Sequence, residues 1–557
     1  MNACTMQKRT LWLTPVLLAL LTLPVATRAA PAAVQQQLEL QVAQLRADGG
    51  MYVQGLALAS GQLLPDFYAA RGYAPVWTRP ARVDELLELL ATAESHGLSS
   101  EDYYLSPLKA LRSRVQRSED PVLVASLDML LTESLIRFGY HQRFGKVNPS
   151  RMEPTWNFTR QFRPGQDPLR TLTEAVAAPS LSGFLGQWVE RAPLYRTLQS
   201  RLSDYRRIAA AGGWPAVPDG PTFKPGDTDA RLATLRERLA ITGDLAGDLA
   251  SESPLAADVY ADALVEGVRH FQARHSLAAD GVLGRRTLDA LNVPVGARVD
   301  QLRLTLERAR WVLDETAGEV VVVNVAGYEV FAARNGTPFW RRRAVVGTQA
   351  RETPIFKGSM TYLDLNPTWT VPPTILREDM LPKVRRDPGY LRAQNISVLD
   401  RNGRVVDPAT INWAGVGGRP PYTFRQGPGP RNALGRIKFM FPNSHSVFLH
   451  DTPSRGLFEQ AERNFSSGCI RVEDPLSLAE IVLGDPGRWN RRTLEEALAT
   501  GKTRTLRLPK PWPVLILYWT AELDGEGQVR FLPDSYRRDP ALLTALDGKV
   551  VIDFPSL

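Results

Sequence analysis

The stretch that decides the interpretation of this sequence is Ser466-Ser467-Gly468-Cys469-Ile470-Arg471-Val472. It follows a strand-like run, Val447-Phe448-Leu449, that leads into His450, 19 positions before Cys469. A thiolate is a nucleophile, and a neighbouring imidazole that takes the thiol proton lets it act near neutral pH. The sequence therefore predicts a catalytic pair, with Cys469 as the nucleophile and His450 as its base.

The glycine beside the predicted nucleophile suits the same chemistry. Gly468 allows the backbone to approach a substrate closely, and the amides around Gly468 and Cys469 are expected to form an oxyanion hole. His445 is the nearest competing histidine, but five strand residues from His450 it would point to the opposite face. A histidine alone at a sheet edge is often structural, so it is the pairing with Cys469 that favours catalysis.

The N-terminus indicates an exported protein. Lys8 and Arg9 precede an apolar stretch from Leu11 to Leu23, and small residues follow as far as Ala29. That stretch is shorter than the roughly 20 residues of a bilayer span, so residues 1–29 are predicted to be a cleaved secretory signal. An uncleaved membrane anchor is the alternative. The expected location is the periplasm, with no transmembrane span beyond the signal segment.

The number and position of the cysteines agree with a functional role for the thiol of Cys469. The chain has two cysteines, and Cys4 lies inside the predicted signal. The mature protein would then hold only Cys469, so no intrachain disulfide is possible in an oxidising compartment. The alternative is that Cys469 is a structural residue, buried as a small hydrophobic side chain.

Composition bounds the remaining possibilities. The 557 residues suggest three or four domains, and 44% apolar with 23% charged residues excludes collagen-like, coiled-coil or largely disordered chains. The formal charge is +8, but the basic residues form no stripe, so no nucleic-acid partner is expected. Neither a metal nor another cofactor is predicted, because His270 and His275 lie five apart, off a shared helix face.

The hydrophobic pattern divides the chain into segments of helical and of β character, which predicts a multidomain α+β protein. Residues 36–222 are expected to form a helical domain, 224–295 a small helical module, and 300–552 a mainly-β domain. The expected helices are Val83 to Glu94 and Leu123 to Phe144. The expected strands are Val320 to Val325, Arg341 to Val346, Ser446 to Leu449 and Val514 to Thr520.

A long interruption, residues 366–426, lies inside the β section. It is rich in proline and carries aromatic residues that resemble exposed substrate contacts: Trp369, Tyr390, Trp413 and Tyr422. A loop of that length in a compact domain is usually a functional lid, a binding subdomain or disorder, and the aromatics argue against disorder. A mobile lid is favoured over a rigid subdomain.

Several of these motifs resemble one family. Val346-Gly347, Thr353-Pro354, His450 and Ser467 to Val472 resemble the L,D-transpeptidase (YkuD-type) catalytic domain. Leu264 to Gln272, followed by Asp280-Gly281, is similar to a peptidoglycan-binding helical module. Leu64 to Trp77 and Leu127 to Asn148 are similar to the scaffold domain of the large YcbB-type enzymes, whose catalytic domain carries a capping insertion where residues 366–426 lie.

The resemblance implies acyl transfer on peptidoglycan stems. Cys469 would attack the carbonyl of the third-position diamino acid of a tetrapeptide donor and release the terminal D-Ala. A second stem would resolve the thioester and give a cross-link between third-position residues. Carbapenems, which mimic the donor for this family, should acylate Cys469. Other cell-wall synthesis proteins are conceivable partners, in a process that shapes the cell.

The resemblance also suggests roles for the neighbours of the pair. The family orients its imidazole with a backbone carbonyl just after the histidine, here that of Asp451, although the Asp451 side chain is an alternative. Arg471 would meet a carboxylate, either of the substrate or of the protein. Ser467 would form a hydrogen-bonding wall of the pocket.

Rival functions stay open at this point. With water as acceptor the same pair would make an L,D-carboxypeptidase or another cysteine hydrolase of stems. A non-catalytic wall-binding scaffold would keep the helical modules without the pair. A metal-dependent peptidase would need a third ligand near Cys469 and His450, and only His445 or Asp451 offers one, at unsuitable spacing.

Overall fold

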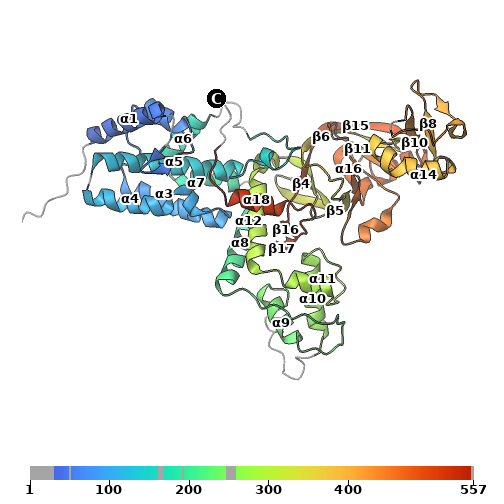
Figure 1. The fold of residues 1–557 in the computed structure, drawn as a ribbon, viewed down its shortest axis with the longest axis horizontal. Helices are drawn as coiled ribbons and strands as arrows, with labels where there is room; N and C mark the ends of the chain where they lie inside the picture. The colour runs from blue at the N-terminus through green and yellow to red at the C-terminus, as the bar shows by residue number, and fades with distance from the viewer. Residues whose placement is uncertain are drawn as a thin grey trace, which may run out of the picture.

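The computed structural model describes residues 31–48, 52–118, 120–160, 167–190, 193–245, 259–418 and 420–552. The predicted signal, residues 1–29, lies outside the described residues. The chain forms a helical domain at one end and a β domain at the other, with a small helical module beside the long central helices (Figure 1). The predicted multidomain α+β class is confirmed. Within the described ranges every helix is too short or too polar to traverse a bilayer.

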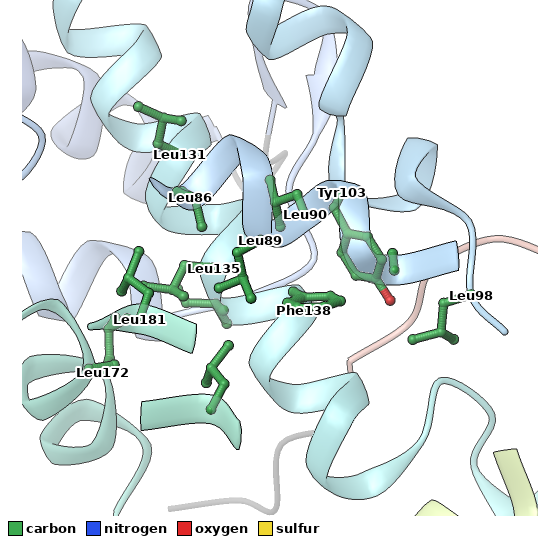
Figure 2. Packing of buried hydrophobic residues seen from close by; sticks show 14 of the residues in the cluster. Leu86, Leu89, Leu90, Leu98, Tyr103, Leu131, Leu135, Phe138, Leu172 and Leu181 are labelled. Carbon is green, nitrogen blue, oxygen red and sulfur yellow. The ribbon is translucent and has the colours of Figure 1, made fainter. Parts of the chain in front are cut away.

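The N-terminal helical domain packs around one long buried helix, α5. Its sequence favours this helix: Pro121 occupies the first turn, the Asp120 side chain caps it, and Gly145 with φ 81° follows its end. Figure 2 shows three leucines of the helix Pro80–Ala91, Leu86, Leu89 and Leu90, lying close to Leu135 and Phe138. The elements are α1 (Pro31–Asp48), β1 (Tyr52–Val53), β2 (Leu56–Ala57), α2 (Leu63–Ala70), α3 (Pro80–Ala91), η1 (Thr92–His96), η2 (Ser100–Tyr103), α4 (Leu105–Ser118), α5 (Pro121–Phe144), η3 (Pro149–Arg151), α6 (Pro168–Ala177), α7 (Leu181–Glu190) and α8 (Pro193–Ala210).

Among its described residues the small module contains three helices, and it docks onto the β domain. Phe271 is fully buried in its core, and Arg274 donates to the Val529 carbonyl at 2.8 Å. His275 lies with its ring centroid 5.6 Å from that of Phe531. The elements are α9 (Leu232–Ile241), α10 (Asp262–Arg274), α11 (Arg285–Leu291), α12 (Val295–Arg310), which leads away from the module, and the docking hairpin β16 (Ala521–Leu523) and β17 (Val529–Phe531).

The β domain is a closed sheet. Its strands run in the order β13-β5-β14-β12-β11-β6-β15-β3-β4, and β4 pairs also with β5. Val321 and Val323 face the barrel interior while Val320 and Val322 pack against the helical domain, so both faces of β3 are apolar. The strands are β3 (Glu319–Asn324), β4 (Glu329–Arg334), β5 (Thr337–Gly347), β6 (Lys357–Leu365), β11 (Ile437–Met440), β12 (Leu449–His450), β13 (Asn464–Ser466), β14 (Ile470–Val472) and β15 (Arg504–Leu517). The other elements are η6 (Leu313–Glu315), η9 (Arg455–Glu459), α16 (Pro475–Leu483), α17 (Arg491–Ala499) and α18 (Asp539–Leu546).

One predicted strand is shorter than expected. The pattern favoured Ser446 to Leu449, but only Leu449–His450 is a strand. Ser446 has φ 56°, and the Asn443 side chain bonds the backbone of His445 and Val447, which holds a turn in place of an extended run. The argument that placed His445 on the far face of that strand was therefore wrong, because this residue lies in the turn.

The interruption at residues 366–426 folds around a core of its own (Figure 1, β8, β10 and α14). Trp413 is only 6% exposed and its Nε1 donates to the Pro408 carbonyl at 2.9 Å. Its predicted role as an exposed substrate contact was wrong, because this aromatic ring supplies apolar area to the core. The other three aromatics are partly buried against it: Trp369, Tyr390 and Tyr422. The elements are β7 (Trp369–Thr370), α13 (Pro373–Ile375), η7 (Leu376–Met380), α14 (Leu381–Arg386), α15 (Gly389–Ala393), β8 (Ile396–Leu399), β9 (Val405–Val406), η8 (Pro408–Thr410) and β10 (Thr423–Gln426).

Candidate active site

The predicted pair lies at the ends of two adjacent strands: His450 ends β12, and Cys469 directly precedes β14. In the parallel register of β12 and β14, Leu449 pairs with Ile470 and His450 with Arg471. Leu449 and Ile470 are fully buried inside the barrel. Because side chains alternate along a strand, His450 lies on the outer face together with Cys469 and Arg471. The register thus brings the histidine and the cysteine to one face of the sheet.

The imidazole is held by a backbone carbonyl. His450 Nδ1 lies 2.5 Å from the Asp451 carbonyl oxygen. A neutral ring that donates through Nδ1 carries its lone pair on Nε2, which is the nitrogen able to accept a proton. Burial, and the charges of Arg471 and Lys438, lower the pKa of His450 to about 3. The ring is therefore neutral at physiological pH.

The thiol is also uncharged at rest. Cys469 is half-buried, and its Sγ lies 3.7 Å from the Ser446 carbonyl oxygen. Burial raises the pKa of the Cys469 thiol, although a backbone hydrogen bond from Phe448 and the charges of Lys438 and Arg471 act against it. A protonated thiol beside a neutral imidazole suits proton transfer during attack rather than a preformed ion pair.

The Asp451 side chain is directed away from the histidine. Its Oδ2 accepts from the Arg436 amide at 2.8 Å, and its Oδ1 accepts from Arg455. Its amide donates to the Ile437 carbonyl at 2.8 Å. A Cβ at Gly435, where φ is 61°, would lie 2.4 Å from the Asp451 carboxyl carbon, which explains the glycine there. The carboxylate thus fixes the turn whose carbonyl contacts the imidazole.

The loop before the nucleophile differs from expectation in one respect. Gly468 has φ 108°, a conformation that favours glycine, but its amide donates to Ser466 Oγ at 3.1 Å. The prediction that this amide forms part of an oxyanion hole was wrong, because a neighbouring hydroxyl occupies it. The Gly468 carbonyl in turn accepts from Thr353 Oγ1 at 2.9 Å, which fixes the loop.

Ser467 joins the nucleophile loop to the insertion. Its exposed hydroxyl accepts from Arg351 Nη1 at 2.8 Å. The same guanidinium donates to both oxygens of Asp379, at 2.6 and 3.1 Å, and to Glu378 at 2.8 Å. Both carboxylates belong to η7 of the insertion. Arg351 therefore ties the insertion to the residue two positions before Cys469.

Two cations flank the pair. Arg471 forms no hydrogen bond or ion pair in the part of the chain that the structure describes, and its Nε is buried without a partner. Sequence reasoning missed Lys438, whose strand β11 pairs it with His450. The alternation of Ile437-Lys438-Phe439-Met440 signals an outward-facing lysine, but only the register places it beside the histidine. Nowhere in the described ranges do three or more His, Cys, Asp or Glu gather to suit a metal ion.

Comparison with known proteins matches three segments. Residues 62–202 match a scaffold domain, 228–291 a putative peptidoglycan-binding domain, and 318–507 an L,D-transpeptidase catalytic domain. A putative L,D-transpeptidase of Haemophilus influenzae is 37% identical over 269 residues, which make up 47% of this chain and 54% of that protein. The chain thus spans about half the length of the curated relative it matches.

Solved L,D-transpeptidases resemble the chain only weakly. One from Xylanimonas cellulosilytica is 16% identical and covers 54% of this chain and 98% of its own, with a TM-score of 0.17. Another, in complex with imipenem, is 13% identical and covers 36% of this chain and 59% of its own, with a TM-score of 0.16. Scores this low carry no argument about the present chain.

Proposed function

We propose that this chain, which combines a scaffold domain, a peptidoglycan-binding domain and an L,D-transpeptidase catalytic domain, is a peptidoglycan L,D-transpeptidase that works by cysteine acyl transfer. The observation that supports the chemistry is the shared face of Cys469 and His450, with the imidazole held through Nδ1 by the Asp451 carbonyl. The carbonyl lets the ring present Nε2 toward a thiol without the help of a third side chain.

The first half-reaction transfers the donor stem to the enzyme. Cys469 Sγ attacks the carbonyl carbon of the third-position diamino acid while its proton passes to His450 Nε2. The peptide bond to the terminal D-Ala breaks, and His450 returns the proton to the leaving amine. The products are a thioester on Cys469 and free D-Ala.

The second half-reaction releases the thioester to an acceptor. The side-chain amine of a second stem attacks the thioester carbonyl and loses a proton to His450. The carbon–sulfur bond breaks, and the thiolate takes that proton back. Water in place of the amine would give an L,D-carboxypeptidase. The insertion, tied by Arg351 to the nucleophile loop, favours transfer if it excludes water from the acyl-enzyme.

The helical parts support this role outside the chemistry. The module that matches a peptidoglycan-binding domain would hold the wall polymer near the catalytic face, in an exported protein of the periplasm. Arg274 and His275 anchor that module on the β domain. These two contacts hold the module against the domain that carries Cys469.

The test is turnover of a disaccharide-tetrapeptide, read by mass spectrometry beside Cys469→Ala. The wild type is expected to form a dimer that has lost one D-Ala, whereas the variant forms none. The variant should keep the wild-type melting temperature, because a half-buried thiol contributes little packing. A carbapenem should add its mass to wild type and not to Cys469→Ala.

The other outcomes separate the rival functions. Free D-Ala with monomeric tripeptide would favour the carboxypeptidase. Equal dimer formation in Cys469→Ala would overturn the assignment of the nucleophile. Lack of turnover in either protein would favour a wall-binding scaffold.

A further inference from the structure

Three side chains form a row across the outer face of the barrel. Lys438 on β11 pairs with His450 on β12, which pairs with Arg471 on β14. Their strand neighbours Ile437, Leu449 and Ile470 are fully buried inside the barrel, so the three side chains share the outer face. Strands lie about 4.8 Å apart, so the backbones of the two cations are about 10 Å from each other with the imidazole between them.

Neither cation has an anionic partner among the described residues. Many arginines in the described ranges form ion pairs, as Arg343 does with Glu459 and Glu473. Arg471 has no such contact, and its Nε is buried without a hydrogen-bond partner. Lys438 Nζ lies 4.0 Å from the ring centroid of Phe448 and makes no ion pair. Burial lowers the pKa of both groups.

A protein carboxylate on the neighbouring strand does not neutralise the lysine. Asp364 on β6 pairs with Lys438 in the register and favours its charge, but no ion pair forms between them. Its Oδ1 instead accepts from Thr505 Oγ1 at 2.6 Å. Two partly desolvated cations without partners are costly to a fold, and such a pair binds carboxylates strongly. The arrangement therefore fits an anion that arrives with the substrate.

The proposed reaction, on which this inference rests, fixes which carboxylate that is. His450 must reach the leaving amine to protonate it. In an amino acid one carbon atom separates the amine nitrogen from the α-carboxyl group, so that group lies against the same row as the imidazole. We infer that Lys438 and Arg471 bind the free α-carboxylate of the leaving amino acid, so that Lys438 is a specificity-determining residue for donors in which a single residue follows the scissile bond.

This arrangement excludes longer stems. In a pentapeptide the carboxyl group of the fourth residue is an amide, which carries no charge and continues into the fifth residue. The row would then hold two cations against a neutral group, and both would stay unpaired. A tetrapeptide donor satisfies them and a pentapeptide does not.

A chemical probe tests the row without relying on turnover. Iodoacetate and iodoacetamide alkylate the same thiol, but only iodoacetate carries a carboxylate. The rate ratio of the two reagents at Cys469, divided by their ratio with free cysteine, is expected to fall roughly tenfold or more in Lys438→Met. Lys438→Arg should restore it, and Lys510→Met, an exposed lysine on β15, should match wild type. An unchanged ratio in Lys438→Met would overturn the inference.

A substrate pair tests the specificity directly. The wild type is expected to turn over the tetrapeptide at least tenfold better in kcat/KM than its C-terminal amide, and Lys438→Met should lose that preference mainly through KM. Equal turnover of acid and amide by the wild type would reject the inference while leaving the proposed function intact. If neither is turned over, the proposed function fails, and the alkylation ratio alone decides whether Lys438 attracts a carboxylate.

Discussion

At the scale of single residues, the site keeps both partners of the proposed catalytic pair, Cys469 and His450, uncharged. Burial acts in the same direction on both, because it disfavours the thiolate of Cys469 and the imidazolium of His450. Lys438 and Arg471 act on them in opposite directions, since a positive charge favours the thiolate and disfavours the imidazolium. A thiol held in its protonated form is less susceptible to oxidation before substrate arrives.

The reactivity of the free enzyme toward a small alkylating agent should reflect this state. Only the thiolate reacts, and the raised pKa of Cys469 means that the iodoacetamide rate keeps climbing above about pH 8.5, the ordinary thiol pKa. Intact-mass kinetics from about pH 5 to pH 10 measure it, with His450→Asn for comparison. A fast, pH-independent rate near pH 5 that disappears in His450→Asn would show a preformed ion pair instead.

At the scale of elements, the insertion is attached to the catalytic domain at two places. Its chain leaves the end of β6 at Leu365 and returns to β11 at Ile437, two strands that pair directly. Arg351 provides a further attachment through η7 and Ser467. Asp364 and Lys438 lie one residue from these ends, so the insertion begins and ends next to the row formed by Lys438, His450 and Arg471. If the insertion moves as a lid, as predicted, this motion would therefore depend on the contact made by Arg351.

Removal of that contact should loosen one edge of the insertion. In Arg351→Met the half-exposed ion pairs and the hydrogen bond to Ser467 are lost, so amide exchange in η7 and α14 should accelerate roughly two- to fivefold. Exchange in the strands of the barrel should not change. Hydrogen–deuterium exchange with mass spectrometry measures both.

Arg377→Met is the matched control for this prediction. Arg377 also pairs with Glu378 but makes no contact with Ser467. Equal acceleration in the two variants would mean that the connection to the nucleophile loop has no part in holding the insertion.

At the scale of the whole molecule, a buried polar junction joins the helical domain to the β domain. Glu307 on α12 accepts from Arg310, from Trp311 Nε1 and from the Val147 amide. Arg310 also donates to Tyr195 and to the His96 carbonyl, and both charged side chains are fully buried. Arg310 and Trp311 lie at the same helix end as Glu307, whereas Val147, Tyr195 and His96 come from three separate segments of the helical domain, so the full junction forms only when α12 packs against that domain.

Four buried histidines predict that the folded protein loses stability in acid. Burial lowers the pKa of His96 and His450 to about 3, and that of His141 and His275 well below the ordinary value. Between about pH 6.5 and pH 3 these four imidazoles are protonated in the unfolded chain but stay neutral in the folded protein. The free energy of unfolding therefore falls as pH falls, by several kcal/mol in total. His270, whose pKa Asp244 raises, acts in the opposite direction but is a single group.

Melting temperatures between about pH 8 and pH 5 measure this dependence. The melting temperature should fall steadily below about pH 6.5. His96→Gln replaces the histidine at the junction by a polar side chain of similar size that does not titrate. In this variant the melting temperature should fall less steeply with decreasing pH. A melting temperature that stays constant over this range would contradict the prediction.

The sequence by itself determined the domain composition and the long regular elements, and it supplied the prediction that Cys469 and His450 form a catalytic pair. The motif around Cys469 and the apolar repeats of α5 and β3 are local signals, and residues 318–507 match the catalytic domain that this motif suggested. The α5 prediction, Leu123 to Phe144, differs from the observed Pro121–Phe144 by two residues because a cap and a proline begin the helix.

Only the tertiary structure decided which groups surround that pair. Lys438 is 31 positions from Cys469 and reaches it through the pairing of β11 with β12, which no local pattern encodes. The choice of the Asp451 carbonyl over its carboxylate, the occupied Gly468 amide and the burial of Trp413 likewise depend on contacts with distant segments. Local sequence sets which chemistry a residue can perform, whereas strand register and packing set which neighbours it has and which atoms remain free.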